Sequence, residues 1–115
     1  MFGCSESNPI SAFEPEIVNN PDAFEFQITD ADNVSTTLSY AWVNSGDRAS
    51  IDHSTVSTDG SGSIVLIDAD GIRVYSSELK ASGTEQAASG APGTWTVTVT
   101  FSGFEGTSNF RVQKL

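Results

Sequence analysis

One segment of the sequence, Asp52-His53-Ser54, contains the residue types of a hydrolytic site. In a serine hydrolase the histidine takes a proton from the hydroxyl while the carboxylate orients the imidazole ring. These three residues are consecutive, however, and successive side chains of a β-strand point to opposite faces, so His53 would point away from both neighbours. The chain has one histidine and one cysteine, which leaves no second set of triad or zinc ligands. We therefore expect no catalytic residues and no cofactor, and we interpret His53 as a partly exposed strand residue.

Two Asp-Ala-Asp segments could offer carboxylate oxygens to calcium. The first holds Asp30 and Asp32, and the second holds Asp68 and Asp70 followed by Gly71. Calcium takes six to eight oxygen ligands, and the second segment is similar to part of a calcium loop. The distal bidentate glutamate of such a loop is missing, and aspartate favours turns on its own account by bonding nearby backbone amides. We interpret both segments as turns, so the four aspartates are only weak calcium candidates and no metal is expected.

Aromatic side chains are the next candidates, because exposed rings can stack on sugars in β-sandwich modules that bind carbohydrate. Trp42 and Trp95 each lie in register with aliphatic residues of their own segments, which predicts that both belong to the core. Phe104 lies at a turn between two glycines, and Tyr75 is on the opposite side of its segment from Val74. We expect Tyr75 and Phe104 to be exposed and to form a candidate binding surface.

The composition limits the classes of partner. The 115 residues include 15 Asp and Glu but only 5 Lys and Arg, which gives a net charge of −10 and a pI of about 4.1. Nucleic acids and anionic membranes bind proteins through clustered Lys and Arg, so neither is an expected partner. The length fits one domain.

The first residues are similar to the end of a bacterial lipoprotein signal. Gly3 precedes Cys4, and a polar stretch that begins with Ser5 follows. In such signals a small residue comes before the cysteine that receives the lipid. We expect Cys4 to be a lipid-attachment residue, residues 1–22 to be a flexible tether with one short edge strand at residues 12–18, and the protein to be extracytoplasmic, in the periplasm or at the cell surface.

Apolar and polar residues alternate from residue 23 onward, which predicts β-strands with one buried face. Segments rich in Asp and Gly separate these strands and are typical of turns, whereas no window predicts a helix. We expect a loop over residues 80–93. Seven to eight short strands predict an all-β domain over residues 23–115, folded as a single antiparallel β-sandwich, Ig-like or jelly-roll-like. The strands are expected within residues 23–29, 34–43, 49–53, 63–67, 72–76, 94–101 and 107–113.

Five segments resemble a group of small bacterial exported lipoproteins with a single β-sandwich domain. They lie at residues 24–28, 38–46, 67–76, 93–99 and 106–114. The last two segments also resemble, more loosely, the pre-peptidase C-terminal domains of secreted enzymes.

The first resemblance implies a location and a fold but no reaction. The expected function is a non-catalytic binding module, a lipid-anchored or periplasmic accessory subunit that contacts another protein of a membrane or surface complex. It would touch the membrane only through the lipid. The alternative function is a carbohydrate-binding module that uses exposed aromatic residues.

Overall fold

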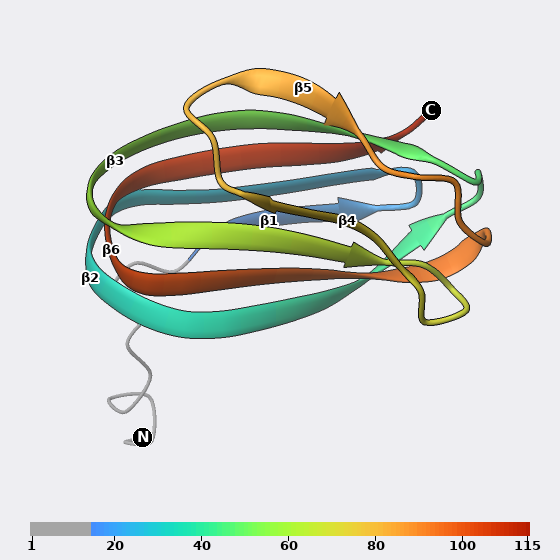
Figure 1. Cartoon of the computed structure of the whole chain (residues 1–115), viewed down its shortest axis with the longest axis horizontal. Coiled ribbons are helices and arrows are strands. Elements are labelled where there is room, and N and C mark those ends of the chain that lie inside the picture. The colour runs from blue at the N-terminus through green and yellow to red at the C-terminus, as the bar shows by residue number, and fades with distance from the viewer. Residues whose placement is uncertain (1–14) are drawn as a thin grey trace.

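Three long strands form most of the fold. The computed structural model describes residues 15–115. The long strands are β2 (Ala23–Asn44), β3 (Ala49–Ile67) and β6 (Gly93–Lys114). All three curve over at one end of the molecule, so each strand runs through both layers of the fold (Figure 1). The described residues include no helix, and therefore no helix long and apolar enough to cross a membrane.

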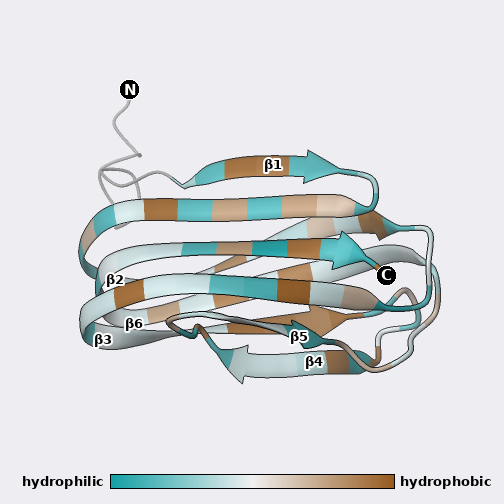
Figure 2. Ribbon diagram, turned by 90° about the horizontal axis from the view of Figure 1, so that it is seen from above, coloured by the Kyte–Doolittle hydropathy of each residue, from teal (hydrophilic) through white to brown (hydrophobic). Residues whose placement is uncertain are grey.

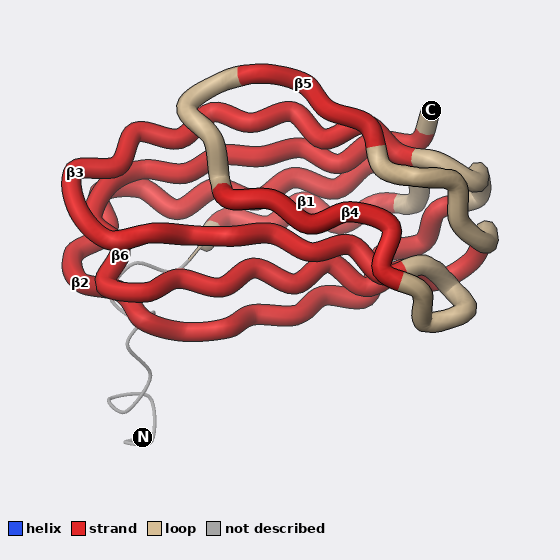
Figure 3. Tube along the Cα trace, viewed as in Figure 1, coloured by secondary structure: helices blue, strands red, loops and turns tan. Residues whose placement is uncertain are grey.

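Three short strands complete the two layers (Figure 3): β1 (Glu16–Asn20), β4 (Arg73–Glu78) and β5 (Gly83–Gln86). The first layer has the order β1-β2-β6-β3-β5 and uses the first halves of β2 and β3 with the second half of β6. The second layer has the order β2-β6-β3-β4 and uses the remaining halves. All pairings are antiparallel, which confirms the prediction of an antiparallel β-sandwich. The short strands expected from the sequence are in part halves of the long ones.

The bends of the three long strands lie side by side, so the pairing continues from one layer to the other. The register shifts between Ile28 and Thr36 of β2 and between Ser57 and Ser61 of β3. Residues with positive φ turn the backbone here, which is the effect of a bulge. The prediction that residues 30–33, 57–62 and 102–106 form turns between separate strands was wrong, because these residues bend continuous strands. The positive-φ residues are Asp30, Asn33, Gly60, Gly103 and Gly106.

Two glycines allow the backbones of β3 and β6 to approach closely at the bend. A Cβ atom on Gly60 would lie 2.0 Å from the carbonyl oxygen of Gly103, and one on Gly106 would lie 2.0 Å from that of Val56. Any side chain at these positions would therefore push the two strands apart.

The core lies between the layers and is built from the inward side of the alternating pattern, which Figure 2 displays as successive apolar and polar bands. Trp42 and Trp95 are fully buried and meet edge to face, with ring centroids 6.0 Å apart. Their indole N–H groups donate to the carbonyl oxygens of Asn20 and Ala91, at 3.0 and 2.8 Å. Both tryptophans are core residues, as predicted. Phenylalanines fill the rest of the aromatic core: Phe24, Phe26, Phe101, Phe104 and Phe110.

The structure corrects the expectations for two segments. Residues 80–93 are not entirely a loop, because β5 pairs with residues 50–53 of β3. Its sequence, Gly-Thr-Glu-Gln, has no apolar alternation, so only the tertiary pairing defines it as a strand. The first edge strand begins at Glu16, and the rest of the expected strand, residues 12–14, lies outside the described residues, as does Cys4.

We predict that Gly106→Ala destabilises the domain far more than Gly71→Ala. The φ of Gly106 is 143° and the added methyl group would overlap Val56, so a cost of about 3 kcal/mol is expected. Gly71 has a φ of 83°, and no atom lies within 4 Å of the place that a methyl group would take, so only backbone strain of about 1 kcal/mol applies. Urea unfolding of the two variants measures the difference, and equal costs would contradict the close approach at the bend.

Candidate functional site

A polar depression lies on the outer face of the first layer. Its volume is about 270 Å³, and it is lined by Asp52 and Ser54 of β3 and by Asn109 and Arg111 of β6. The four side chains share this face because each pair is two residues apart on its strand. Asp52 lies opposite Arg111 and Ser54 lies opposite Asn109 in the β3–β6 register. The strand pairing therefore assembles the depression from two segments that are far apart in the sequence.

Charged and hydroxyl groups extend the depression across the sheet. Arg111 forms an ion pair with Glu25 of β2, with 3.5 Å between Nε and Oε1. On the other side the Thr84 hydroxyl of β5 donates to Oδ1 of Asp52 at 3.3 Å. The guanidinium keeps further N–H donors and the Asp52 carboxylate keeps further acceptor positions, because each group has more sites than these contacts use. The lining can both donate to and accept from hydroxyl groups of a ligand.

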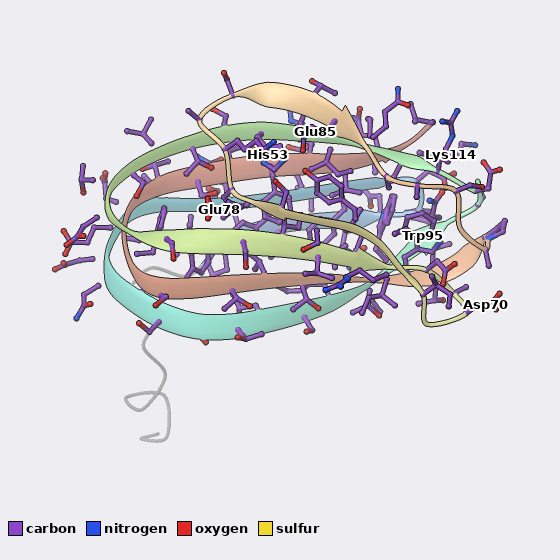
Figure 4. The ribbon with its side chains drawn as sticks, in the orientation of Figure 1. His53, Asp70, Glu78, Glu85, Trp95 and Lys114 are labelled. Carbon is purple, nitrogen blue, oxygen red and sulfur yellow. The ribbon has the colours of Figure 1, made fainter. Side chains whose placement is uncertain are left out.

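The chain's single histidine belongs to a different cluster, at the rim where β3, β4 and β5 meet (Figure 4). The Nε2 atom of His53 lies 2.8 Å from the hydroxyl of Tyr75, and that hydroxyl donates to Oε1 of Glu85 at 2.5 Å. The Lys80 ammonium contacts Oε2 of the same carboxylate at 2.5 Å. This cluster links the residues after β4, and β5 itself, to β3.

The hydrogen bonds of this cluster fix the neutral state of the histidine. Nδ1 accepts the backbone N–H of Lys80 at 3.4 Å, so the ring proton is on Nε2 and is donated to Tyr75. Burial lowers the pKa of His53, against the opposing effect of the nearby Glu85 carboxylate. Burial, followed by the bond to Glu85, raises the pKa of Tyr75 to about 12. The bond from Lys80, followed by that from Tyr75, lowers the pKa of Glu85.

The expectations for His53, Tyr75 and Phe104 need correction. His53 is 2% exposed instead of partly exposed, because Tyr75 and the backbone N–H of Lys80 contact its ring. Phe104 is 1% exposed, because it lies in a bend that faces the core, where its ring packs 4.9 Å from that of Phe101. Tyr75 is half-buried and its hydroxyl is used within the cluster. These two aromatic residues therefore do not form an exposed surface.

The second Asp-Ala-Asp segment forms a turn around a buried carboxylate. Asp68 is 6% exposed and accepts backbone N–H groups from Asp70, Ile72 and Ala91 at 3.0, 2.8 and 2.9 Å. The bonds from Ala91 and Ile72 are the main causes that lower its pKa. Asp70 lies at the exposed tip of this turn (Figure 4).

The first segment, with Asp30 and Asp32, is the exposed bend of β2. Within residues 15–115 no group of three or more His, Cys, Asp or Glu side chains is placed to hold a metal ion.

Sequence reasoning considered Asp52 and Ser54 only as members of a hydrolytic triad, which it rejected, and it did not consider Asn109 and Arg111. Asp52 and Ser54 do share a face, as the alternation requires, with His53 on the other side of the strand. The residues that complete the depression come from β6, and the register that places them next to β3 is not local information. The local signal was the outward position of Asn109 and Arg111, which alternate with the buried Phe110 and Val112.

Solved structures with a similar fold include carbohydrate-binding modules. The module CBM6cm-2 of lichenase 5A from Cellvibrio mixtus, in complex with cellotriose, has a TM-score of 0.50 and 15% identity, covering 90% of this chain and 87% of that one. The C-terminal CBM6 of LamC, a marine laminarinase of Zobellia galactanivorans, has a TM-score of 0.47 and 12% identity, covering 88% and 89%. The sequence matches no protein-family model and no curated protein. The Cellvibrio module shows that this chain shares the β-sandwich fold of such modules.

We predict that acid destabilises the domain through His53. Because the folded chain lowers the pKa of His53 from 6.5, the histidine contributes fully to stability above pH 6.5, and this contribution is lost as the pH falls through the lowered value. His53→Gln keeps a donor for Tyr75 but does not titrate. Between about pH 7.5 and about pH 5, wild type should lose more unfolding free energy than the variant. Parallel losses in urea titrations would contradict the prediction.

Proposed function

We propose that this chain is a non-catalytic carbohydrate-binding module and that the glycan binds over the depression of Asp52, Ser54, Asn109 and Arg111. The depression is the observation that carries the proposal, because it gathers donors and acceptors on an open sheet face. A sugar presents hydroxyl groups that are donors and acceptors at once, so alternating carboxylate, hydroxyl, amide and guanidinium groups suit it. The fold shared with the Cellvibrio module supports the same class of function.

The chemistry of the depression favours neutral glycans. Arg111 is its single cation, and the carboxylates of Asp52 and Glu25 lie on either side of it. The chain as a whole carries a net charge of −10, which repels uronates and sulfated sugars. Outward positions on the strands of this layer hold no aromatic ring among residues 15–115, so recognition relies on hydrogen bonds instead of stacking. Each net bond is worth about 1 kcal/mol, so the affinity is expected to be modest.

The prediction of a lipid-anchored, extracytoplasmic accessory subunit rests on Cys4 and stays a prediction. The mass of the protein purified from membranes tests it, since a diacylglyceryl group on Cys4 would add a defined mass. This prediction is compatible with glycan binding, because a tether and a sugar site occupy different parts of the chain.

We predict that Arg111→Ala and Asp52→Ala each weaken glycan binding about tenfold or more, because each removes charged hydrogen-bonding groups from the depression. Affinity electrophoresis through gels that contain neutral polysaccharides, among them β-glucans, measures the loss, with polyuronates as the anionic comparison. Gln113→Ala is the matched control, since Gln113 is exposed on the same strand and face but does not line the depression. The proposal fails if no polysaccharide retards the protein, or if all three variants bind like wild type.

A further inference from the structure

The two layers of the sandwich differ by one strand. The first layer continues past β2 to β1, whereas the second layer ends at β2 among the described residues. At the opposite rim both layers continue past β3. The first layer ends in β5 and the second layer ends in β4. Figure 2 shows β1 at one rim and β4 with β5 at the other. Within residues 15–115, the place in the second layer next to β2 and opposite β1 is therefore free of a strand, and we call it the rim slot.

The edge of β2 at the rim slot has backbone groups that point away from β6. The carbonyl oxygen of Ala41 accepts the side-chain amide of Asn19 at 2.8 Å, and that of Val43 accepts the N–H of Asp22 at 2.8 Å. Because backbone groups of alternate residues point the same way, those of Thr37 and Ser39 also point away from β6. No described strand pairs with them. The bond from Asn19 closes one end of the slot and leaves residues 36–40 as its open edge.

Half-buried apolar side chains line the slot from both layers. Leu38 and Tyr40 of β2 and Ile17 of β1 pack against the core but remain partly exposed. The ring of Tyr40 lies 5.5 Å from that of Phe24 and 6.3 Å from that of Phe26, measured between centroids. At the opposite rim, by contrast, the bond between Tyr75 and Glu85 joins β4 to β5. A strand placed in the slot would cover the core at this rim, as β4 and β5 do at the other.

The residues that bound the slot carry only acidic charges, although two of them, Asp22 and Glu25, form ion pairs with Lys114 and Arg111 of β6. Residues 16–44 contain five Asp and Glu and no Lys or Arg: Glu16, Asp22, Glu25, Asp30 and Asp32. The open edge itself, residues 36–40, is uncharged and has no proline, which distinguishes it from the guarded edges of most native sheets. The other three edge strands are short and each carries charge. Together with the net charge of −10 of the chain, the remaining acidic residues favour an occupant with basic residues.

We propose that the rim slot binds an extended basic segment of another protein by strand addition. Its backbone would pair with Thr37 and Ser39, its inward side chains would be apolar and would contact Ile17, Leu38 and Tyr40, and its outward side chains would include lysine or arginine. A second copy of this chain does not fit the requirement, because β1 overhangs the slot and the copy would bring the same acidic strands. The polar depression lies on the outer face of the first layer, whereas the slot lies at the rim of the second layer.

Amide hydrogen exchange on the isotope-labelled full chain tests the slot before any ligand is added. The amides of Thr37 and Ser39 should exchange at least tenfold faster than those of Leu38 and Tyr40, which point toward β6. Slow exchange at Thr37 and Ser39 in a monomer would mean that the chain's own residues fill the slot, and slow exchange in a dimer would mean that a second copy does. Either result would overturn the proposal.

Two synthetic seven-residue probes then test the occupant. Both alternate valine with a charged residue, which is lysine in one probe and glutamate in the other. The lysine probe should slow the exchange of Thr37 and Ser39 at least fivefold, and the glutamate probe should not. Ser39→Pro removes an outward N–H and should weaken lysine-probe binding at least tenfold, whereas Ser39→Ala keeps that N–H and should bind like wild type.

Three outcomes would overturn the proposal: no binding of the lysine probe, equal binding of both probes, or unchanged binding to Ser39→Pro. If Ser39→Pro fails to fold, Leu38→Lys provides the second test, since it places like charge in the slot and should also weaken lysine-probe binding. Polysaccharide retardation of Ser39→Pro should equal that of wild type, which separates this proposal from that of the glycan site.

Discussion

The close approach of β3 and β6 at the bend is the constraint on which the rest of the structure depends. Gly60 and Gly106 let two backbones pass where a single methyl group would lie 2.0 Å from a carbonyl oxygen. Because the strands bend together instead of ending, their pairing continues from one layer into the next. The layers are thereby held in register, and the core, the depression and both rims take their positions from that register. Asp30 and Asn33 provide the corresponding positive φ values on β2.

The sequence was sufficient to predict the class of fold and most of the core. The alternation around Phe24, Trp42 and Trp95 indicates which side of each strand is buried, because strand geometry imposes a period of two. It did not distinguish a bend within a strand from a turn between strands, since Asp, Asn and Gly serve both by adopting positive φ. That ambiguity also explains Phe104, which was expected at an exposed turn tip and instead lies in the core.

The functional candidates were harder to predict because they depend on pairing between distant segments. Asp52 and Arg111 become neighbours only through the β3–β6 register. His53 makes its contacts with Tyr75 of β4 and with the backbone of Lys80, just before β5, and β5 has no strand pattern of its own. Local reasoning placed the histidine correctly on the side of its strand opposite Asp52 and Ser54. It could not count the strands of each layer, so the difference between the two rims was visible only in the structure.

β6 lies between β2 and β3 in both layers, and it also follows every other described strand in the sequence. While the preceding residues emerge from the ribosome, β2 and β3 lack the strand that joins them in either layer. We therefore expect the sandwich to form only once β6 is present, because neither layer can be completed without it. Until β6 is present, only the β1–β2, β3–β4 and β3–β5 pairings can form, and both layers stay open between β2 and β3.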